Sequence, residues 1–156
     1  MKSMRTTTRL ACILAFLSVV AWGTQARAQF FAGTTWIRTD AEGKGMTMSV
    51  AVCCNGGYRL TYQIPAIGGQ PAMVMTIDSP LNGTDVPTLI GGKPSGQSMA
   101  IKRVDDHHYT AVVKLNGQPM MTSTGVVSAD NKTMTVEDVS QGRGNGPKTI
   151  ETWVRK

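Results

Sequence analysis

The chain has 156 residues, with 16 lysines and arginines against 10 aspartates and glutamates and a formal net charge of +6. This is a one-domain length. The first 28 residues have the composition of an export leader, and removing them leaves 128 residues with a charge of +2, because the leader holds four basic residues and no acidic one: Lys2, Arg5, Arg9 and Arg27. The near-neutral remainder argues against a nucleic-acid or polyanion partner.

Residues 1–28 have the three parts of a cleavable signal peptide. A positively charged start precedes a 13-residue apolar run, Leu10–Trp22, and the small-x-small sequence Ala26–Ala28 ends the segment. The run is short for a membrane-spanning helix, which needs about 20 apolar residues, so an uncleaved anchor is the less favoured alternative. Cys12 is poorly placed for a lipoprotein signal. With bacterial-looking sorting signals, we expect a periplasmic or secreted protein with no stable membrane anchor.

Beyond the leader, apolar residues recur at every second position, and Gly, Asn, Asp and Pro interrupt the pattern at short intervals. This pattern is typical of antiparallel strands. Met46–Val52 and Tyr58–Ile64 each have one apolar face, and Asn55-Gly56 between them suits a tight hairpin turn. Ten strands are predicted, over residues 34–39, 45–53, 57–64, 72–78, 84–90, 97–104, 107–115, 119–128, 132–140 and 147–155.

Short strands with one apolar face leave free edges unless the sheet closes or doubles over. We therefore expect residues 29–156 to form a single all-β domain, an antiparallel up-and-down β-barrel of about ten strands. A sandwich of the same strands is the alternative, because local periodicity does not distinguish the two. The glycine-rich segment Gly142–Gly146 is interpreted as a flexible connection before the last strand.

Cys53 and Cys54 are the only cysteines that follow the leader. Adjacent Cα atoms are held about 3.8 Å apart, which is below the usual disulfide range. The favoured interpretation is two unpaired thiols without a catalytic role, with Cys54 on the apolar face and Cys53 on the outer face. A vicinal disulfide, or a bridge to another molecule in an oxidising compartment, is the alternative.

Four segments resemble the small secreted bacterial lipocalin-like barrel proteins, of the calycin type, most of which are uncharacterised. Gly33–Trp36 is similar to the Gly-x-Trp start of their first strand, and Asn82–Pro87 with Gly91 resembles a D-G-K-D-Y-P…G segment. Ile101–Asp105 is similar to a K-R-x-D strand end, and Val127–Val136 resembles a V-S-x-D-G-K-T-(M/L)-T-V hairpin. The resemblance implies a barrel with a small-molecule cavity, and no established activity.

The chain departs from this pattern in several places. One extra threonine separates Gly33 from Trp36, Val86 stands where an aromatic residue is usual, and Asn131 replaces a turn glycine. Asparagine tolerates the left-handed conformation that the turn requires. The connection Asp40–Lys44 is too short for the helical lid of intracellular fatty-acid carriers, so a ligand portal must be built differently.

His107 and His108 are the only histidines. Neighbours on a strand point to opposite faces, so the two do not readily share a metal ion, and zinc needs three or four converging ligands. With Asp105 and Asp106 before them, they are interpreted as a solvated polar hairpin. The sequence holds no catalytic motif and no nucleophile–base pair, so we expect no enzyme activity, no metal site and no cofactor.

Eight methionines follow the leader, and two pairs, Met46 with Met48 and Met73 with Met75, each share one face of a strand. Thioethers at this spacing suggest copper(I) as a minor hypothesis. The favoured interpretation is that these flexible apolar side chains fill an irregular cavity wall.

Arg103 shares strand parity with Ile101, so it could point inward and meet an acidic ligand group. The favoured alternative places it at the strand end, reaching solvent. Tyr58, Tyr62 and Tyr109 lie on apolar faces, where packing is their first expected role and orienting a ligand their second.

The favoured function is therefore binding of a small apolar ligand inside the barrel, by burial of apolar surface. An envelope protein-interaction or structural module with a packed barrel is the alternative, and a cavity of at least roughly 300 Å³ would favour the first. No partner protein is indicated. The predicted lining consists of Met46, Met48, Tyr58, Leu60, Tyr62, Met73, Met75, Arg103, Tyr109 and Val113.

Overall fold

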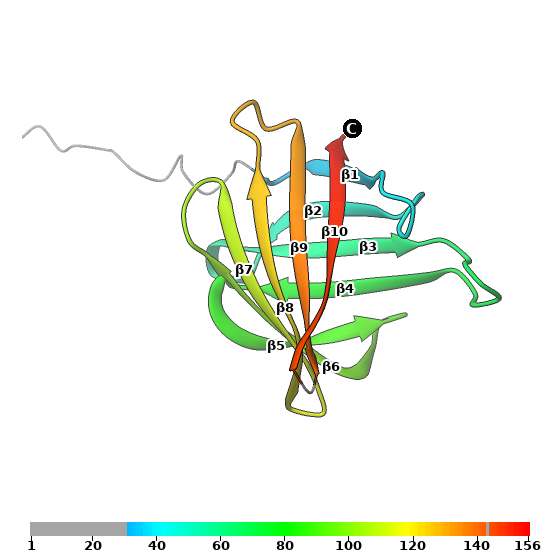
Figure 1. Ribbon diagram of the computed structural model, residues 1–156. Helices are drawn as coiled ribbons and strands as arrows, with labels where there is room; N and C mark the ends of the chain where they lie inside the picture. The colour runs from blue at the N-terminus through cyan, green and yellow to red at the C-terminus, as the bar shows by residue number, and fades with distance from the viewer. Residues whose placement is uncertain (1–30, 143) are drawn as a thin grey trace, which may run out of the picture.

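Ten antiparallel strands follow one another along the chain and close into a barrel (Figure 1). The structure is a computed structural model that describes residues 31–142 and 144–156, so the predicted leader lies outside the described residues. No helix in these two ranges has the length and apolar character needed to cross a bilayer. The elements are β1 (Thr34–Arg38), β2 (Thr47–Cys53), a 3₁₀ turn η2 (Cys54–Gly56), β3 (Gly57–Ile64), β4 (Met73–Ser79), β5 (Asn82–Ile90), β6 (Lys93–Arg103), β7 (His108–Leu115), β8 (Gln118–Val127), β9 (Thr133–Gly142) and β10 (Gly144–Arg155).

The pairing of β1 with β10 closes the sheet and confirms the barrel over the sandwich. Each other pair joins strands that are consecutive in sequence, whereas Trp36 of β1 is opposite Met48 of β2 on one side and Arg155 of β10 on the other. Closure leaves no unpaired strand edge. In Figure 1 the strands β7–β10 run steeply across β1–β4, so two walls face each other over the interior.

All ten predicted strands are present, and their ends differ from the prediction by four residues or fewer. The largest difference is at β6, which begins at Lys93 instead of residue 97. Pro94 and Gly96 look like loop residues in the sequence, but Pro94 pairs with Leu89 next to an irregularity in the β5–β6 register. A bulge of this kind accommodates proline within a sheet.

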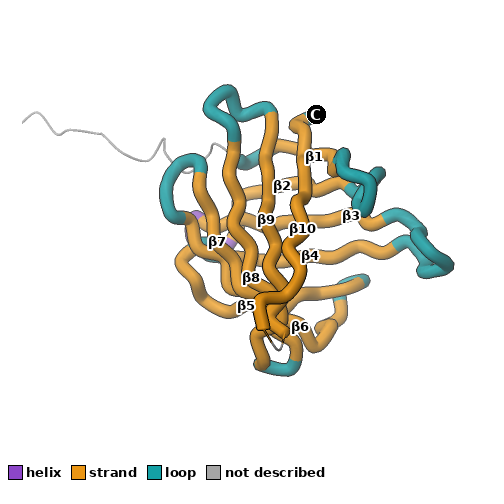
Figure 2. Tube along the Cα trace, viewed as in Figure 1, coloured by secondary structure: helices purple, strands orange, loops and turns teal. Residues whose placement is uncertain are grey.

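The turns use residues that tolerate a positive φ. Asn131 adopts φ 62° in the β8–β9 turn, as its place in the sequence predicts, and Asn116-Gly117 forms the tight turn between β7 and β8. Figure 2 shows these connections as teal segments joining the orange strands. Asparagine and glycine reach the left-handed region at little cost.

Cys53 and Cys54 form a vicinal disulfide, so the expectation of two unpaired thiols is wrong. The bond lies in the β2–β3 connection, where Cys54 has φ 52° and Asn55 has φ 54°. Cys54 is exposed, and not on the apolar face as predicted. Alternation places a side chain in the interior only where the strand borders it. Val52, two residues before Cys54, is already 56% exposed, so β2 has passed the interior before it reaches Cys54.

An aromatic cluster fills the barrel end at which β1, β3 and β7 begin. Phe31 stacks on Trp36 with ring centroids 5.6 Å apart and meets Tyr109 edge-on at 5.2 Å, and Tyr58 lies beside it at 6.4 Å. Thr34 fixes this segment, because its hydroxyl donates to the Phe31 carbonyl at 2.6 Å and accepts from the Trp36 indole at 2.9 Å. Phe31 therefore closes this end of the barrel.

The start of β3 requires glycine. A Cβ on Gly57 would lie 2.1 Å from the backbone oxygen of Ser79 and 2.6 Å from the Cα of Pro80. Neither backbone atom can move without disturbing the β3–β4 pairing.

We expect Gly57→Ala to lower the free energy of unfolding by about 2–3 kcal/mol, measured by urea denaturation, because overpacking forces a backbone shift. Gly125→Ala is the matched control, since its Cβ meets nothing nearer than 3.8 Å, and it should change stability by less than about 1 kcal/mol. Equal stability of Gly57→Ala and the parent would contradict this close approach.

The disulfide predicts the alkylation pattern. Under denaturing, non-reducing conditions, mass spectrometry should find Cys53 and Cys54 unmodified by iodoacetamide, and reduction should then expose both thiols to alkylation. Cys53→Ser is the control, because its remaining thiol should react without reduction. Alkylation of both residues in the unreduced protein would show that the bond is not formed.

Candidate functional site

The barrel encloses a cavity of about 270 Å³. Its walls come from alternate residues of the strands, because successive side chains point to opposite faces of a sheet. Most of the lining is apolar, and six methionines contribute to it: Met46, Met48, Met75, Met99, Met121 and Met134. The interior is thus partly open, beyond the packed aromatic end.

Seven of the ten predicted lining residues border the cavity: Met46, Met48, Tyr58, Leu60, Tyr62, Met75 and Tyr109. The structure does not bring the other three to it. Val113 is buried away from the open space, and Met73, at the start of β4, borders a separate hollow with Gln63 and Pro65. Their cross-strand neighbours Met99, Met121 and Ile64 do border the cavity, so strand parity gives the face of a side chain but not whether it reaches the open space. Ligand binding by the seven stays a prediction.

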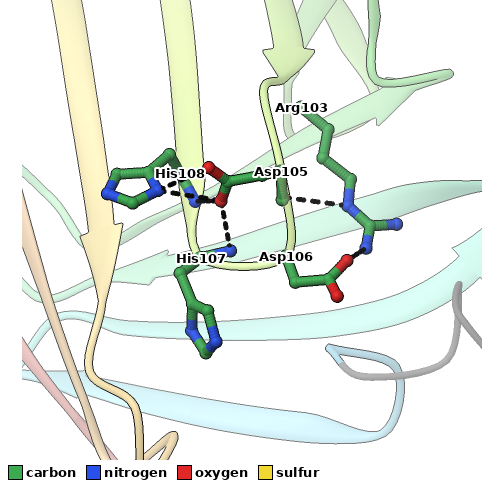
Figure 3. A network of polar contacts seen from close by, with 5 residues as sticks. All are labelled: Arg103, Asp105, Asp106, His107 and His108. Atoms are coloured by element: carbon green, nitrogen blue, oxygen red, sulfur yellow. Dashed lines mark hydrogen bonds and ion pairs between the residues drawn. The ribbon is translucent and has the colours of Figure 1, made fainter.

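Arg103, the third of these residues, ends β6 and takes part in the polar hairpin shown in Figure 3. Its guanidinium pairs with the Asp106 carboxylate, and its Nε donates to the carbonyl of Asp105 at 3.1 Å. This agrees with the strand-end interpretation. The Arg103 side chain contacts the turn residues Asp105 and Asp106 and does not line the cavity.

The same hairpin holds both histidines. The Asp105 carboxylate accepts the backbone N–H groups of His107 and His108 at 2.8 Å each and contacts His108 Nδ1 at 2.8 Å. These contacts, led by the His107 N–H, lower the pKa of Asp105. The two imidazole rings point away from each other in Figure 3, so they do not converge on one ion. The predicted polar turn is confirmed.

One group of three metal-ligand side chains converges among the described residues, namely Cys53, Cys54 and Asp78. Metals bind thiolates, and the disulfide leaves neither sulfur in that form. The methionines that border the cavity belong to an apolar wall, in keeping with the filler interpretation.

Three charged residues line one part of the cavity wall, and a fourth, Asp40, pairs with one of them behind it. We call this group the polar pole: Arg38, Asp40, Asp138 and Glu151. Arg38 holds two of them, with Nε 2.7 Å from Asp40 Oδ2 and an Nη 2.6 Å from Glu151 Oε1. The second oxygen of Glu151 accepts the Trp153 indole N–H at 2.9 Å. Burial raises the pKa of Glu151, against the lowering effect of the Trp153 hydrogen bond and of Arg38.

Asp40 connects the polar pole to the chain that follows β1. One oxygen accepts the N–H of Gly43 at 3.1 Å, and the other accepts the N–H of Thr152 in β10 at 3.1 Å. The hydrogen bond from Arg38 is the largest of the contacts that hold the pKa of Asp40 at about 2. One carboxylate therefore ties β1, its turn and β10 together.

Tyr62 and Asp138 complete the polar pole. Burial raises the pKa of the Tyr62 phenol well above its usual value, and the negative charges of Glu151 and Asp138 add to this. Asp138 lines the cavity with only 7% of its surface exposed. The Tyr62 ring meets Trp153 edge-on, with centroids 6.0 Å apart, so two aromatic rings lie on the same wall as these carboxylates.

Sequence reasoning missed Phe31 and the charged members of the polar pole. Strand parity could have found these charged residues, because each lies two positions from an inward apolar residue and therefore on the same face. The pairs are Arg38 with Trp36, Asp138 with Val136 and Glu151 with Trp153. A charged residue in phase with an inward apolar face is an interior charge that needs a partner. Nothing in the sequence pattern predicts that Phe31, ahead of the first strand, packs inside.

Comparisons with protein-family models, with curated proteins and with solved structures find no significant match to this chain. The closed ten-stranded antiparallel barrel is consistent with a calycin-like fold. The candidate site therefore depends on the geometry of the cavity and its polar pole.

Asp40→Asn is expected to lower the free energy of unfolding at pH 7 by about 1–2 kcal/mol, because it removes charge-assisted hydrogen bonds. The folded-state pKa of Asp40 is about 2, below the unfolded value near 3.9. Its contribution is therefore present above about pH 4 and is lost as the pH falls through about 2.

Urea denaturation of both proteins between pH 7 and pH 2 measures this contribution. The stability difference should shrink toward zero at the acid end, where the Asp40 carboxyl becomes protonated in the folded parent protein as well. A difference that stays constant with pH would contradict the assigned role of the Asp40 charge.

Proposed function

We propose that this protein is an exported barrel that binds a small, largely apolar molecule in its interior without changing it chemically. The observation that carries the proposal is the cavity of about 270 Å³, walled by apolar side chains and bearing a few charged groups at one place. Ligand pockets typically combine an apolar lining with a small number of orienting polar groups.

The size of the cavity indicates a small ligand. Its volume is slightly under the roughly 300 Å³ at which drug-sized pockets begin, yet the interior is open and not solid. A packed barrel acting only through its outer face would need no such space. The volume falls just short of the roughly 300 Å³ expected for ligand binding, so the preference for the binding function over the interaction module rests on the apolar lining with its few charged groups.

The two barrel ends suggest how a ligand enters. Phe31 fills the end at which β1 begins. The polar pole lies toward the opposite end, because Arg38 ends β1 and Asp138 lies in the second half of β9. We place the entrance at this second end, between the connections that follow β1 and β3. An entering molecule would meet polar groups first and bury its apolar part toward Tyr58 and Tyr109.

Cavity filling tests the function. Ala111 lines the cavity, so Ala111→Phe should reduce the affinity for hexan-1-ol by at least about tenfold, or 1.4 kcal/mol, by occupying the ligand's space. Titration can be followed by the fluorescence of Trp153, which borders the cavity, and by NMR shifts. Ala51→Phe makes the same change on the exposed face of β2 and should leave the affinity unchanged.

Native mass spectrometry of protein purified from its own envelope should in addition show a retained small molecule. Equal hexan-1-ol binding by the parent and Ala111→Phe would place the ligand outside the cavity. If neither the Trp153 fluorescence nor the NMR shifts of the parent protein reach saturation with hexan-1-ol, the binding function is overturned and the packed interaction module is favoured.

A further inference from the structure

Asp138 is a largely buried carboxylate on the cavity wall, with 7% of the residue surface exposed. Its charge acts on Arg38, but it is not one of the two carboxylates that pair with the Arg38 guanidinium at 2.7 and 2.6 Å. A buried charge without a partner is costly, and such groups are normally paired or bind a ligand. The open space beside Asp138 is where a partner would fit.

The neighbouring charges do not fill this role. The Arg38 guanidinium is held by Asp40 and Glu151 at 2.7 and 2.6 Å, and both Glu151 oxygens are occupied, one by Arg38 and the other by the Trp153 indole. The polar pole therefore has three carboxylates against one guanidinium. Its excess negative charge favours a cationic group over an anionic one.

The surroundings of Asp138 suit an ammonium group on an apolar tail. Tyr62 and Trp153 line the cavity together with Asp138 and Glu151, with ring centroids 6.0 Å apart, and aromatic rings of this kind can attract cations. On β9, Val136 and Met134 precede Asp138 on the inward face and line the cavity toward its aromatic end. Head and tail positions thus follow one another along the barrel.

From this arrangement we propose that the cavity binds a small aliphatic ammonium ion, with its charged nitrogen at Asp138 and its hydrocarbon part among the apolar walls. This proposal rests on the proposed binding function and specifies the ligand's chemistry. The volume of about 270 Å³ limits the ligand to a short-chain amine. A molecule with a carboxylate head would meet the carboxylates of Asp138 and Glu151 and a guanidinium that is already paired.

Three probes of equal chain length test the proposal: hexylamine, hexan-1-ol and hexanoate, titrated at pH 7 into the full chain. We expect hexylammonium to bind at least about tenfold more tightly than the alcohol, and hexanoate to bind most weakly. This comparison needs no variant, so it does not depend on how well a substituted protein folds.

Asp138→Asn then assigns the preference to one residue. The variant should lose most of the preference for hexylamine over hexan-1-ol, measured as the ratio of the two affinities. Asp85→Asn is the matched control, because Asp85 pairs with Lys114 outside the cavity, and it should retain the preference. Circular dichroism and urea denaturation verify that each variant is folded.

The outcomes separate the two proposals. Binding of hexan-1-ol without a preference for the amine, or an amine preference that survives Asp138→Asn, overturns the ammonium proposal and leaves the binding function standing. Failure of the parent protein to bind any of the three probes overturns both.

Discussion

The hydrogen-bonded seam between β1 and β10 is the constraint on which the rest of the structure depends. It joins residues at opposite ends of the described chain, with Arg38 opposite Trp153. Closure turns alternate side chains of every strand toward one enclosed interior and brings Arg38 next to Glu151. Without the seam, β1 and β10 would be free edges, the guanidinium would lack its second carboxylate, and no cavity would exist.

Much of the fold could be predicted from the sequence, because two-residue alternation is a local property. It placed Met48 and Leu60 on inward faces, and the strand ends followed from turn residues such as Asn131. Alternation gives the face of a strand on which a side chain lies but not whether that face borders the cavity there. Val52 and Met73 are in phase with inward residues, yet Val52 is exposed and Met73 borders a separate hollow. The inward charges Arg38 and Asp138 were missed because inward positions were searched for apolar residues only. Contacts such as Phe31 with Tyr109 depend on closure and have no local signal.

The two ends of the barrel interior differ in chemical character. Aromatic rings fill one end, with Phe31 and Trp36 stacked on each other, and ionised groups gather toward the other. Between them lie methionines and aliphatic side chains. Burial of charge is costly unless partners are supplied, and the ion pairs of Arg38 supply them for two of the carboxylates. Under the proposed binding function, such an interior would distinguish the two ends of an elongated molecule.

The methionine-rich wall carries a consequence for selectivity. An unbranched thioether side chain with three rotatable bonds can repack around different shapes, so the resting volume of the cavity is not a rigid template. Discrimination among hydrocarbon portions should therefore be shallow. Under the proposed function, strict discrimination would be left to the polar pole, in which Arg38, Asp40 and Glu151 are held by mutual pairing and by backbone contacts. A receptor of this design would sort compounds by their termini and tolerate diversity in their bodies.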